Sequence, residues 1–258
     1  MKYYLDLFSG IGGFALGAYW AGLRFNNHYF SEVDDYAIKV YQQRFADAIG
    51  LGDITKIDGT KLPQGDWIIA GGFPCQDISI AGKGAGLEGK RSGLWFEYAR
   101  IISELRPRYA IMENVGALSF RGLDAVLGSL AEIGYDAEWQ DIRASDVGAP
   151  HLRERIWIVA YPERCPRVAG EDRGILQKND GKERERFIKA VGGKNRIVLK
   201  MGQASNTIFG TQPPSPKSMR MDDGISETMD RLKCLGNSIV PQIAELIFRQ
   251  EAFNEWRI

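Results

Sequence analysis

The stretch of sequence that decides the fold is YYLDLFSGIGG, residues 3–13. Its first part, YYLDLF (3–8), is a short apolar run that predicts a buried strand, and a glycine-rich turn follows. The next residues, FALGAYWAGL (14–23), have the composition of a helix. Glycines between a strand and a helix let the backbone approach a ligand closely, and the helix start offers free N–H groups. The simpler alternative is a tight turn that binds nothing.

The alternation of strand and helix continues outward from this turn as far as residue 162. Further strands are predicted at 28–34, 66–72, 108–115 and 155–161, and further helices at 35–46, 92–107 and 123–134. This order predicts an α/β fold, a mainly parallel sheet with helices on both faces. Apolar helical spacing returns at 240–253, where a last helix is expected to rejoin the core.

The region between these parts has a different composition. Residues 163–220 are rich in Gly, Pro, Lys and Arg and show little periodicity. The 258 residues suit one large domain, or one with a small addition. We therefore expect a core of residues 1–162, completed by 231–258, and a small irregular module at 163–230.

Cysteine usage and hydropathy suggest the compartment. The three cysteines, Cys75, Cys165 and Cys234, are too widely spaced for a disulfide framework or a zinc site. Reduced thiols indicate the cytosol. A secretory signal and an apolar run of membrane length are both missing from the sequence, so a cytoplasmic protein without membrane association is expected.

Charge is unevenly distributed although the whole chain is balanced, with 33 basic and 33 acidic residues. Residues 151–220 hold 15 Lys and Arg against 7 Asp and Glu, whereas the rest of the chain holds 18 against 26. Such asymmetry indicates that one region meets a polyanion such as nucleic acid. A solvated basic surface is the alternative.

Two acidic residues follow the segments next to the glycine turn. Glu32 ends the second strand, about 20 residues after the glycines, where a carboxylate can bind ribose hydroxyls. Asp53 lies in the following segment and can reach an adenine. No GxxxxGK[ST] phosphate loop occurs, which argues against ATP hydrolysis.

A cysteine follows the apolar strand at 66–72, in the sequence GGFPCQ (71–76). Cys75 is placed just past the carboxyl end of the strand, where α/β proteins bind their ligands. The following loop, residues 76–93, is long and glycine-rich, as mobile lids often are. These features favour a nucleophilic thiolate over a buried structural cysteine.

Three more segments contain candidate site residues. Glu113 ends an apolar strand in ENV (113–115), with a helix cap or a salt bridge as the alternative. In HLRER (151–155), Arg153 and Arg155 share one face of an extended stretch and suit a phosphate or a base oxygen; sheet-surface arginines are the alternative. The sequence LGNSIVPQ (235–242) opens the last helix, and its alternative is a capping turn with Asn237 or Ser238 as the N-cap.

Together these motifs resemble the DNA (cytosine-5) methyltransferase family. Its motif order is matched by DLFSGIGG (6–13), Glu32, GFPCQ (72–76), ENV, RER (153–155) and GNSIVPQ (236–242). Each motif alone is weakly specific for the family, whereas the order and spacing of all of them together are strongly specific. The resemblance covers residues 3–161 and 231–248, about two-thirds of the chain. It implies a Rossmann-like S-adenosylmethionine-dependent methyltransferase fold, with 1–162 and 231–258 as the catalytic domain and 163–230 as the target-recognition region.

The resemblance also implies a role for each matched residue. Cys75 would add to C6 of a cytosine flipped out of duplex DNA, while Glu113 and Arg155 face the base and Arg153 supports the pocket. The implied S-adenosyl-L-methionine contacts are Phe8, Ser9, Gly10, Gly12, Glu32, Val33, Asp53, Ile54, Gly72, Pro74, Leu94, Asn237 and Ser238. The implied DNA contacts are Gln76, Lys83, Lys90 and Arg91. No metal is implied.

Two departures from the family pattern are visible. His151 stands where many members carry glutamine, and the block at 220–238 is short. Short forms of this kind resemble enzymes of phages and prophages. The recognition region, about 163–225, is small, so a short target is expected. We expect a monomer that acts on double-stranded DNA in a bacterial cytoplasm, with a possible companion restriction endonuclease.

The sequence leaves three alternatives open. A relative could methylate tRNA cytosine with the same machinery, although the basic segment favours DNA. A non-catalytic DNA-binding relative conflicts with the intact Cys75, Glu113 and Arg155. A nicotinamide-dependent oxidoreductase would explain the glycine turn and Glu32 but not GFPCQ or ENV.

Overall fold

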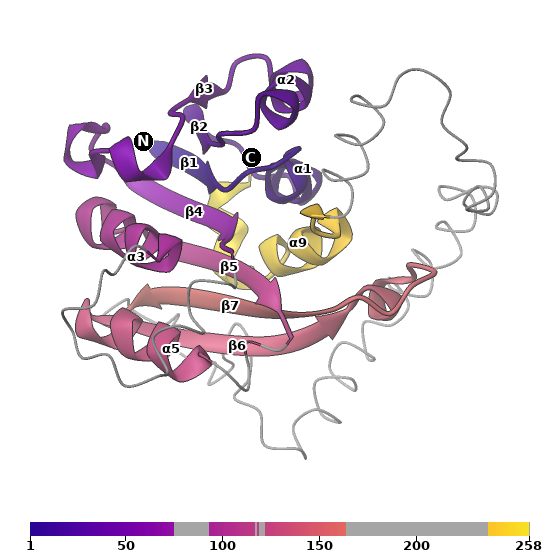
Figure 1. The fold of residues 1–258 in the computed structure, drawn as a ribbon. Coiled ribbons are helices and arrows are strands. Elements are labelled where there is room, and N and C mark those ends of the chain that lie inside the picture. Colours follow the sequence, from indigo (N-terminus) through magenta and orange to yellow (C-terminus); the bar gives the residue numbers. More distant parts are fainter. Residues whose placement is uncertain (75–92, 117, 119–121, 164–236, 258) are drawn as a thin grey trace.

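The computed structural model describes residues 1–74, 93–116, 118, 122–163 and 237–257. Within them, seven strands form one sheet in the order β3-β2-β1-β4-β5-β7-β6 (Figure 1). The strands are β1 (Lys2–Leu7), β2 (Asn27–Ser31), β3 (Ile49–Gly50), β4 (Asp66–Gly72), β5 (Tyr109–Val115), β6 (Tyr135–Arg143) and β7 (Glu154–Pro162). The α-helices are α1 (Gly13–Trp20), α2 (Asp35–Arg44), α3 (Leu94–Leu105), α5 (Leu123–Glu132) and α9 (Pro241–Phe248). The short 3-10 helices are η1 (Ile54–Lys56), η2 (Gly59–Lys61), η4 (Ala144–Val147) and η6 (Glu251–Trp256).

The sheet is mainly parallel, as the alternation of elements predicted. Strands β3, β2, β1, β4 and β5 run in parallel, and β7 is antiparallel to both β5 and β6. The prediction missed β6, an edge strand in which buried and partly exposed residues are mixed. Such a strand lacks the continuous apolar run that marks a strand buried on both faces. The helix expected at 240–253 is two pieces, α9 and η6.

Helices cover both faces of the sheet (Figure 1). On one face, α3 and α5 bury Trp95, Tyr98 and Val126 in the same apolar cluster as Leu5 and Leu7 of β1. On the other face, α1, α2 and α9 enclose a second cluster that includes Tyr4. Strand β1 supplies both clusters because successive side chains of a strand point to opposite faces.

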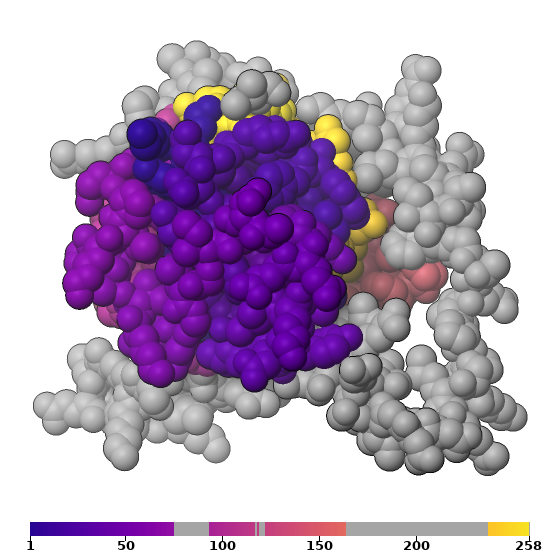
Figure 2. Space-filling view, turned by 90° about the horizontal axis from the view of Figure 1, so that it is seen from above, coloured from indigo at the N-terminus to yellow at the C-terminus, as the bar shows by residue number. Residues whose placement is uncertain are grey.

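The C-terminal segment packs against the N-terminal one (Figure 2, yellow beside indigo). A Cβ atom on Gly17 of α1 would lie 2.6 Å from the Cβ of Ala244 in α9, so the two helices are in close contact. After α9, the carbonyl of Trp256 accepts a hydrogen bond from the N–H of Arg24 at 2.9 Å. The exact limits of the expected domains fall at or beside residues outside the described ranges and stay a prediction.

In the described part of the chain, no helix has both the length and the hydropathy needed to cross a bilayer.

Candidate active site

The candidate site residues gather at one edge of the sheet. The parallel strands β1, β2, β4 and β5 end there, and the antiparallel strand β7 begins there. Phe8, Glu32 and Pro74 follow β1, β2 and β4, while Glu113 lies near the end of β5. The carboxyl edge of a parallel sheet is the usual place for a ligand in α/β proteins.

The glycine turn at this edge has an unusual backbone. Gly10 and Gly12 have φ angles of 51° and 85°, and Phe8 also has a positive φ, 51°. Positive φ is uncommon and strained for a residue with a side chain, and such strain concentrates at functional sites. Gly12 is the N-cap of α1 and has no side chain to cap it. The buried carboxylate of Asp6 lies against the N–H of Ala15 in the first turn, and the other N–H groups of that turn are left for a ligand.

Glu32 ties the end of β2 to the glycine turn. One of its carboxylate oxygens accepts a hydrogen bond from the N–H of Gly10 at 2.8 Å. The other accepts from the N–H groups of Val33 at 2.8 Å and Asp34 at 3.0 Å. The apolar side chain of Val33 is 69% exposed beside this carboxylate. A carboxylate and an open apolar side chain thus stand together next to the turn.

A second turn lies near β2. The carboxylate of Asp53 caps η1 by accepting from the N–H of Thr55 at 3.0 Å and from its hydroxyl at 2.9 Å. These hydrogen bonds, from the backbone first, lower the pKa of Asp53. The hydroxyl of Ser31 donates to the carbonyl of Gly52 at 2.7 Å, which fastens the turn to β2.

These residues fit an adenosyl cofactor. Phe8, Ile54 and Leu94 belong to, or pack against, the same apolar cluster. The carboxylates of Glu32 and Asp53 suit ribose hydroxyls and an adenine amine. The hydroxyl of Ser9 is buried without a hydrogen-bond partner among the described residues, so the turn retains an unused polar group.

Glu113 and Arg155 form an ion pair at the end of β5. The Nε atom of Arg155 lies 3.0 Å from Oε1 of Glu113, whose side chain is 11% exposed. Burial raises the pKa of Glu113 to about 7, although Arg155 and Arg153 act in the opposite direction. The salt bridge named as the simpler alternative is thus present, but a carboxyl that titrates near neutral pH is also suited to proton transfer.

Gly72 lies beside this carboxylate. It pairs with Glu113 across β4 and β5, and a Cβ atom on Gly72 would lie 3.0 Å from Oε2 of Glu113. A larger residue at position 72 would crowd the carboxylate. The sequence pointed to a cofactor contact for Gly72, whereas its observed neighbour is the acid.

The expectation that Arg153 and Arg155 share one face of an extended stretch is wrong. Strand β7 begins at Glu154, and Arg153 precedes it with a φ of 22°, outside the extended region. The strand alternation therefore does not apply to Arg153. Its Nη2 atom instead donates to the carbonyl of Ser238 at 2.8 Å. His151 beside it is exposed.

The segment that holds Asn237 and Ser238 lies against the glycine turn. A Cβ atom on Gly13 would lie 2.6 Å from Cγ1 of Ile239. Helix α9 begins at Pro241 with Val240 as its N-cap, so the alternative in which Asn237 or Ser238 caps this helix is wrong. The hydroxyl of Ser238 donates to the carbonyl of Ile239 at 3.1 Å.

Asn114 is a site residue to which sequence reasoning assigned no role. Its Nδ2 atom donates to the carbonyl of Phe73 at 2.8 Å, and its Oδ1 atom accepts from the N–H of Val115 at 2.8 Å. The side chain is buried and holds the backbone directly before Pro74. The sequence feature that points to Asn114 is its place as a polar residue at the end of an apolar strand.

Some candidate residues lie outside the described part of the chain. They are Cys75, Gln76, Lys83, Lys90 and Arg91. Pro74, which directly precedes Cys75 in the sequence, is described and exposed.

The chain is similar to known proteins along most of its length. Residues 3–211 match the family model described as C-5 cytosine-specific DNA methylase. The Type II methyltransferase M1.ScrFI of Lactococcus lactis subsp. cremoris is 42% identical over 164 residues, which are 62% of this chain and 41% of that protein. The orphan methyltransferase M.SPRI of Bacillus phage SPR is 29% identical over 250 residues, 93% of this chain and 54% of that protein.

A solved structure extends the comparison to the fold. The crystal structure of a DNMT2 from Spodoptera frugiperda has a TM-score of 0.59 and 17% identity, and the match covers 96% of this chain and 99% of that one. At this identity the likeness concerns the fold alone. The chain spans about half the length of the curated relatives it matches. Because the family model covers most of its residues, the chain belongs to the C-5 cytosine-specific DNA methylase family.

Proposed function

We propose that this protein transfers a methyl group from S-adenosyl-L-methionine to C5 of a cytosine in double-stranded DNA. The observation that carries the proposal is the ion pair between the buried Glu113 and the partly exposed Arg155, which lies at the same sheet edge as the glycine turn. One side of this edge suits an adenosyl group, and the other suits a polar ring with acceptor and donor atoms.

The cofactor would be held by the glycine turn and its neighbours. Glu32 would bind the ribose hydroxyls, and Asp53 would receive a hydrogen bond from the adenine amine. The apolar contacts to the adenine would come from Phe8, Val33, Ile54 and Leu94. When bound, S-adenosyl-L-methionine supplies an electrophilic methyl group attached to sulfur. Asn237 and Ser238, which lie next to Ile239, would complete the cofactor side.

The residues on the other side would activate the base. Cytosine C5 is a weak nucleophile until a thiolate adds to C6. Cys75 would form that bond, while Glu113 passes its proton to N3 and Arg155 holds the O2 edge of the ring. A pKa of about 7 leaves Glu113 protonated in a large fraction of molecules at neutral pH, so the acid form is available. C5, made electron-rich in this way, would take the methyl group as the bond of that group to sulfur breaks, and S-adenosyl-L-homocysteine would be the leaving group.

The methylated cytosine must then be released from its covalent bond to Cys75. The proton on C5 leaves to a base or to water, the C5–C6 double bond re-forms, and Cys75 departs as a thiolate. The proton on N3 returns to Glu113. None of these atoms is reachable in a stacked duplex, so the cytosine must be flipped into the site. We further propose that the protein acts as a monomer and that Gln76, Lys83, Lys90 and Arg91 contact the DNA.

The proposal is tested by methyl transfer to defined substrates. Tritiated S-adenosylmethionine is incubated with the protein and either duplex DNA or tRNA. Transfer to DNA is expected; transfer to tRNA alone would replace the proposed substrate. Bisulfite sequencing of DNA from cells that express the protein then identifies the methylated site.

The covalent step has its own test. Cys75→Ser is expected to abolish transfer while cofactor binding is kept. A duplex with 5-fluorocytosine at the target should trap a covalent complex, because fluorine cannot leave C5 as a proton would. DNA binding without trapping would exclude the Cys75 adduct.

A further inference from the structure

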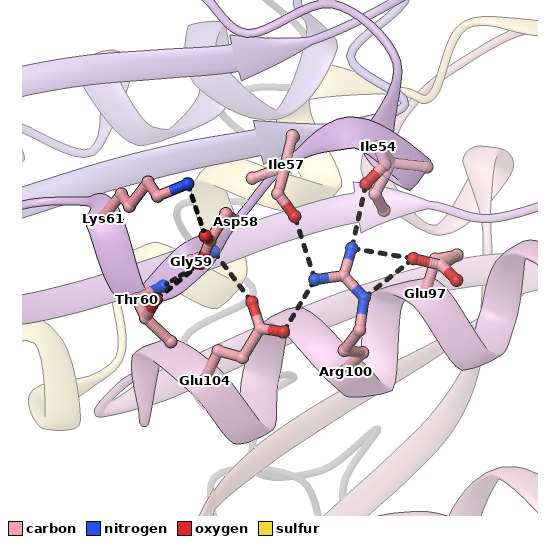
Figure 3. Close-up of polar contacts among 9 residues, drawn as sticks. All are labelled: Ile54, Ile57, Asp58, Gly59, Thr60, Lys61, Glu97, Arg100 and Glu104. Atoms are coloured by element: carbon pink, nitrogen blue, oxygen red, sulfur yellow. Dashed lines mark hydrogen bonds and ion pairs between the residues drawn. The ribbon is translucent and has the colours of Figure 1, made fainter.

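Helix α3 carries an arginine that is bonded to the turn next to the proposed adenine site (Figure 3). The guanidinium of Arg100 donates to two backbone carbonyls, that of Ile54 at 3.1 Å and that of Ile57 at 2.9 Å. The same group is held by two carboxylates of its own helix, Glu97 at 2.7 Å and Glu104 at 2.7 Å. The guanidinium side chain is 32% exposed, so these contacts are only partly open to water.

The second carboxylate extends the connection along the chain. While Oε1 of Glu104 binds Arg100, its Oε2 atom accepts from the N–H of Gly59 at 2.7 Å. Arg100 and Glu104 therefore hold three backbone groups between residues 54 and 59. These backbone groups have fixed partners on a helix, although η1 and η2 are only single turns.

The position of this network relates it to the proposed cofactor site. Asp53 caps the start of η1, and Arg100 holds the carbonyl of Ile54, the first residue of η1. Leu94, the first residue of α3, packs against the same apolar cluster as Ile54. One helix thus supplies an apolar residue for the site and fixes the turn that carries two more candidate residues.

We propose that Arg100, braced by Glu97 and Glu104, is a positioning residue that sets the place of Asp53 and Ile54 for the adenine of the cofactor. The inference rests on the proposed function. Arg100 acts through the turn and does not itself touch the cofactor. Arginine suits this task because its planar fork can donate to carboxylates and carbonyls at once, whereas a lysine ammonium has no such fixed geometry.

The test measures affinity and selectivity in full-length protein by calorimetry. Two ligands are compared: S-adenosylhomocysteine, and its analogue with hypoxanthine in place of adenine, which lacks the exocyclic amine. Arg100→Met is expected to weaken S-adenosylhomocysteine binding about tenfold. The reason is that a displaced Asp53 loses its hydrogen bond to the adenine amine, and losing a hydrogen bond to a charged group usually has an effect of this size. It should also reduce the preference for adenine over hypoxanthine, because Asp53 is no longer held in place. Arg100→Lys should restore part of the affinity for S-adenosylhomocysteine and part of the preference for adenine.

A matched control separates positioning from stability. Arg249, the C-cap of α9, also pairs with a glutamate of that helix, Glu245 at 2.7 Å, and donates to a backbone carbonyl, that of Trp20 at 3.2 Å. Arg249→Met should lower the melting temperature without changing affinity or base preference. An equal loss of affinity in this control would overturn the inference, since the effect would then follow general stability.

The remaining outcomes are also decisive. If the wild-type protein binds S-adenosylhomocysteine and Arg100→Met binds it with the same affinity and selectivity, the inference fails and the proposed function stands. If the wild-type protein binds neither ligand, both fail. Should Arg100→Met not fold, Arg100→Lys carries the test, and wild-type selectivity in that variant would overturn the role of the planar fork.

Discussion

The guanidinium of Arg155 reaches the carboxylate of Glu113 diagonally across two antiparallel strands, with 3.0 Å between Nε and Oε1. In the register of β5 and β7, Arg155 lies opposite Val115, and Glu113 lies opposite Trp157. Residues two apart on a strand share a face, so both side chains point to the same side of the sheet. The reversed direction of β7 is what brings its first residues to the edge where β5 ends. A parallel β7 would have placed Arg155 at the opposite edge.

The raised pKa of Glu113 predicts a pH dependence of stability. The folded protein holds the proton of the Glu113 carboxyl more tightly than the unfolded chain does. Protonation of Glu113 therefore contributes fully to the free energy of unfolding below the ordinary pKa of 4.5, and this contribution is lost as pH rises through about 7. Glu113→Gln does not titrate and should lack this loss. Relative to wild type, its free energy of unfolding should gain about 2–3 kcal/mol between pH 5 and pH 8. Urea denaturation across this range measures it, and parallel profiles would show that Glu113 keeps an ordinary pKa.

The bond from Asn114 to Phe73 predicts a role in presenting Cys75. Asn114→Asp would place a carboxylate oxygen against the carbonyl of Phe73, and the two acceptors repel. We expect covalent trapping by 5-fluorocytosine DNA to slow by about tenfold or more, because small displacements of a reacting group are costly. Cofactor affinity should be unchanged. Asn26→Asp, an exposed site that keeps its acceptor for the N–H of Lys2, is the control. Unaltered trapping in Asn114→Asp would refute the role.

Two aspartates with the same capping contacts separate capping from cofactor binding, although Asp58 also forms an ion pair with Lys61. Asp53 and Asp58 each cap a 3-10 helix and accept from the N–H and hydroxyl of the threonine two residues later. Asp→Asn keeps most of the capping ability at either position. Asp53→Asn should weaken S-adenosylhomocysteine binding about tenfold, as loss of a charged hydrogen-bond partner does, whereas Asp58→Asn should not. Equal affinities in calorimetry would remove Asp53 from the site.

The close contact of α1 and α9 predicts opposite effects for two glycine substitutions. In Gly17→Ala the new methyl group would lie 2.6 Å from Cβ of Ala244 and 2.7 Å from the carbonyl oxygen of Pro241. Overpacking of this kind should destabilise the protein by about 1–3 kcal/mol. Gly128 in α5 has no heavy atom within 4 Å of the equivalent position, so Gly128→Ala should stabilise by about 0.5–1 kcal/mol. Thermal unfolding of both variants is the measurement; a neutral Gly17→Ala would contradict the packing of α9 on α1.

The sequence by itself determined the parallel half of the sheet and the order of the motifs. Strands such as β4 and β5 are buried on both faces and therefore read as apolar runs, and glycines mark the turn after β1. It also placed Glu32, Asp53 and Glu113 after or near strand ends, because these residues interrupt apolar segments. Edge strand β6 escaped prediction because polar residues such as Glu138 and Gln140 alternate with its apolar ones, so that no apolar run marks it.

Only the tertiary structure decided how the site residues meet. The pairing of Glu113 with Arg155, the bond from Asn114 to Phe73 and the contacts of Arg100 join residues that lie far apart in the chain. The pKa of Glu113 depends on its burial and on charges from another strand, which no local pattern contains. Short-range signals fix where each element starts and ends, whereas electrostatics and packing follow from which elements become neighbours.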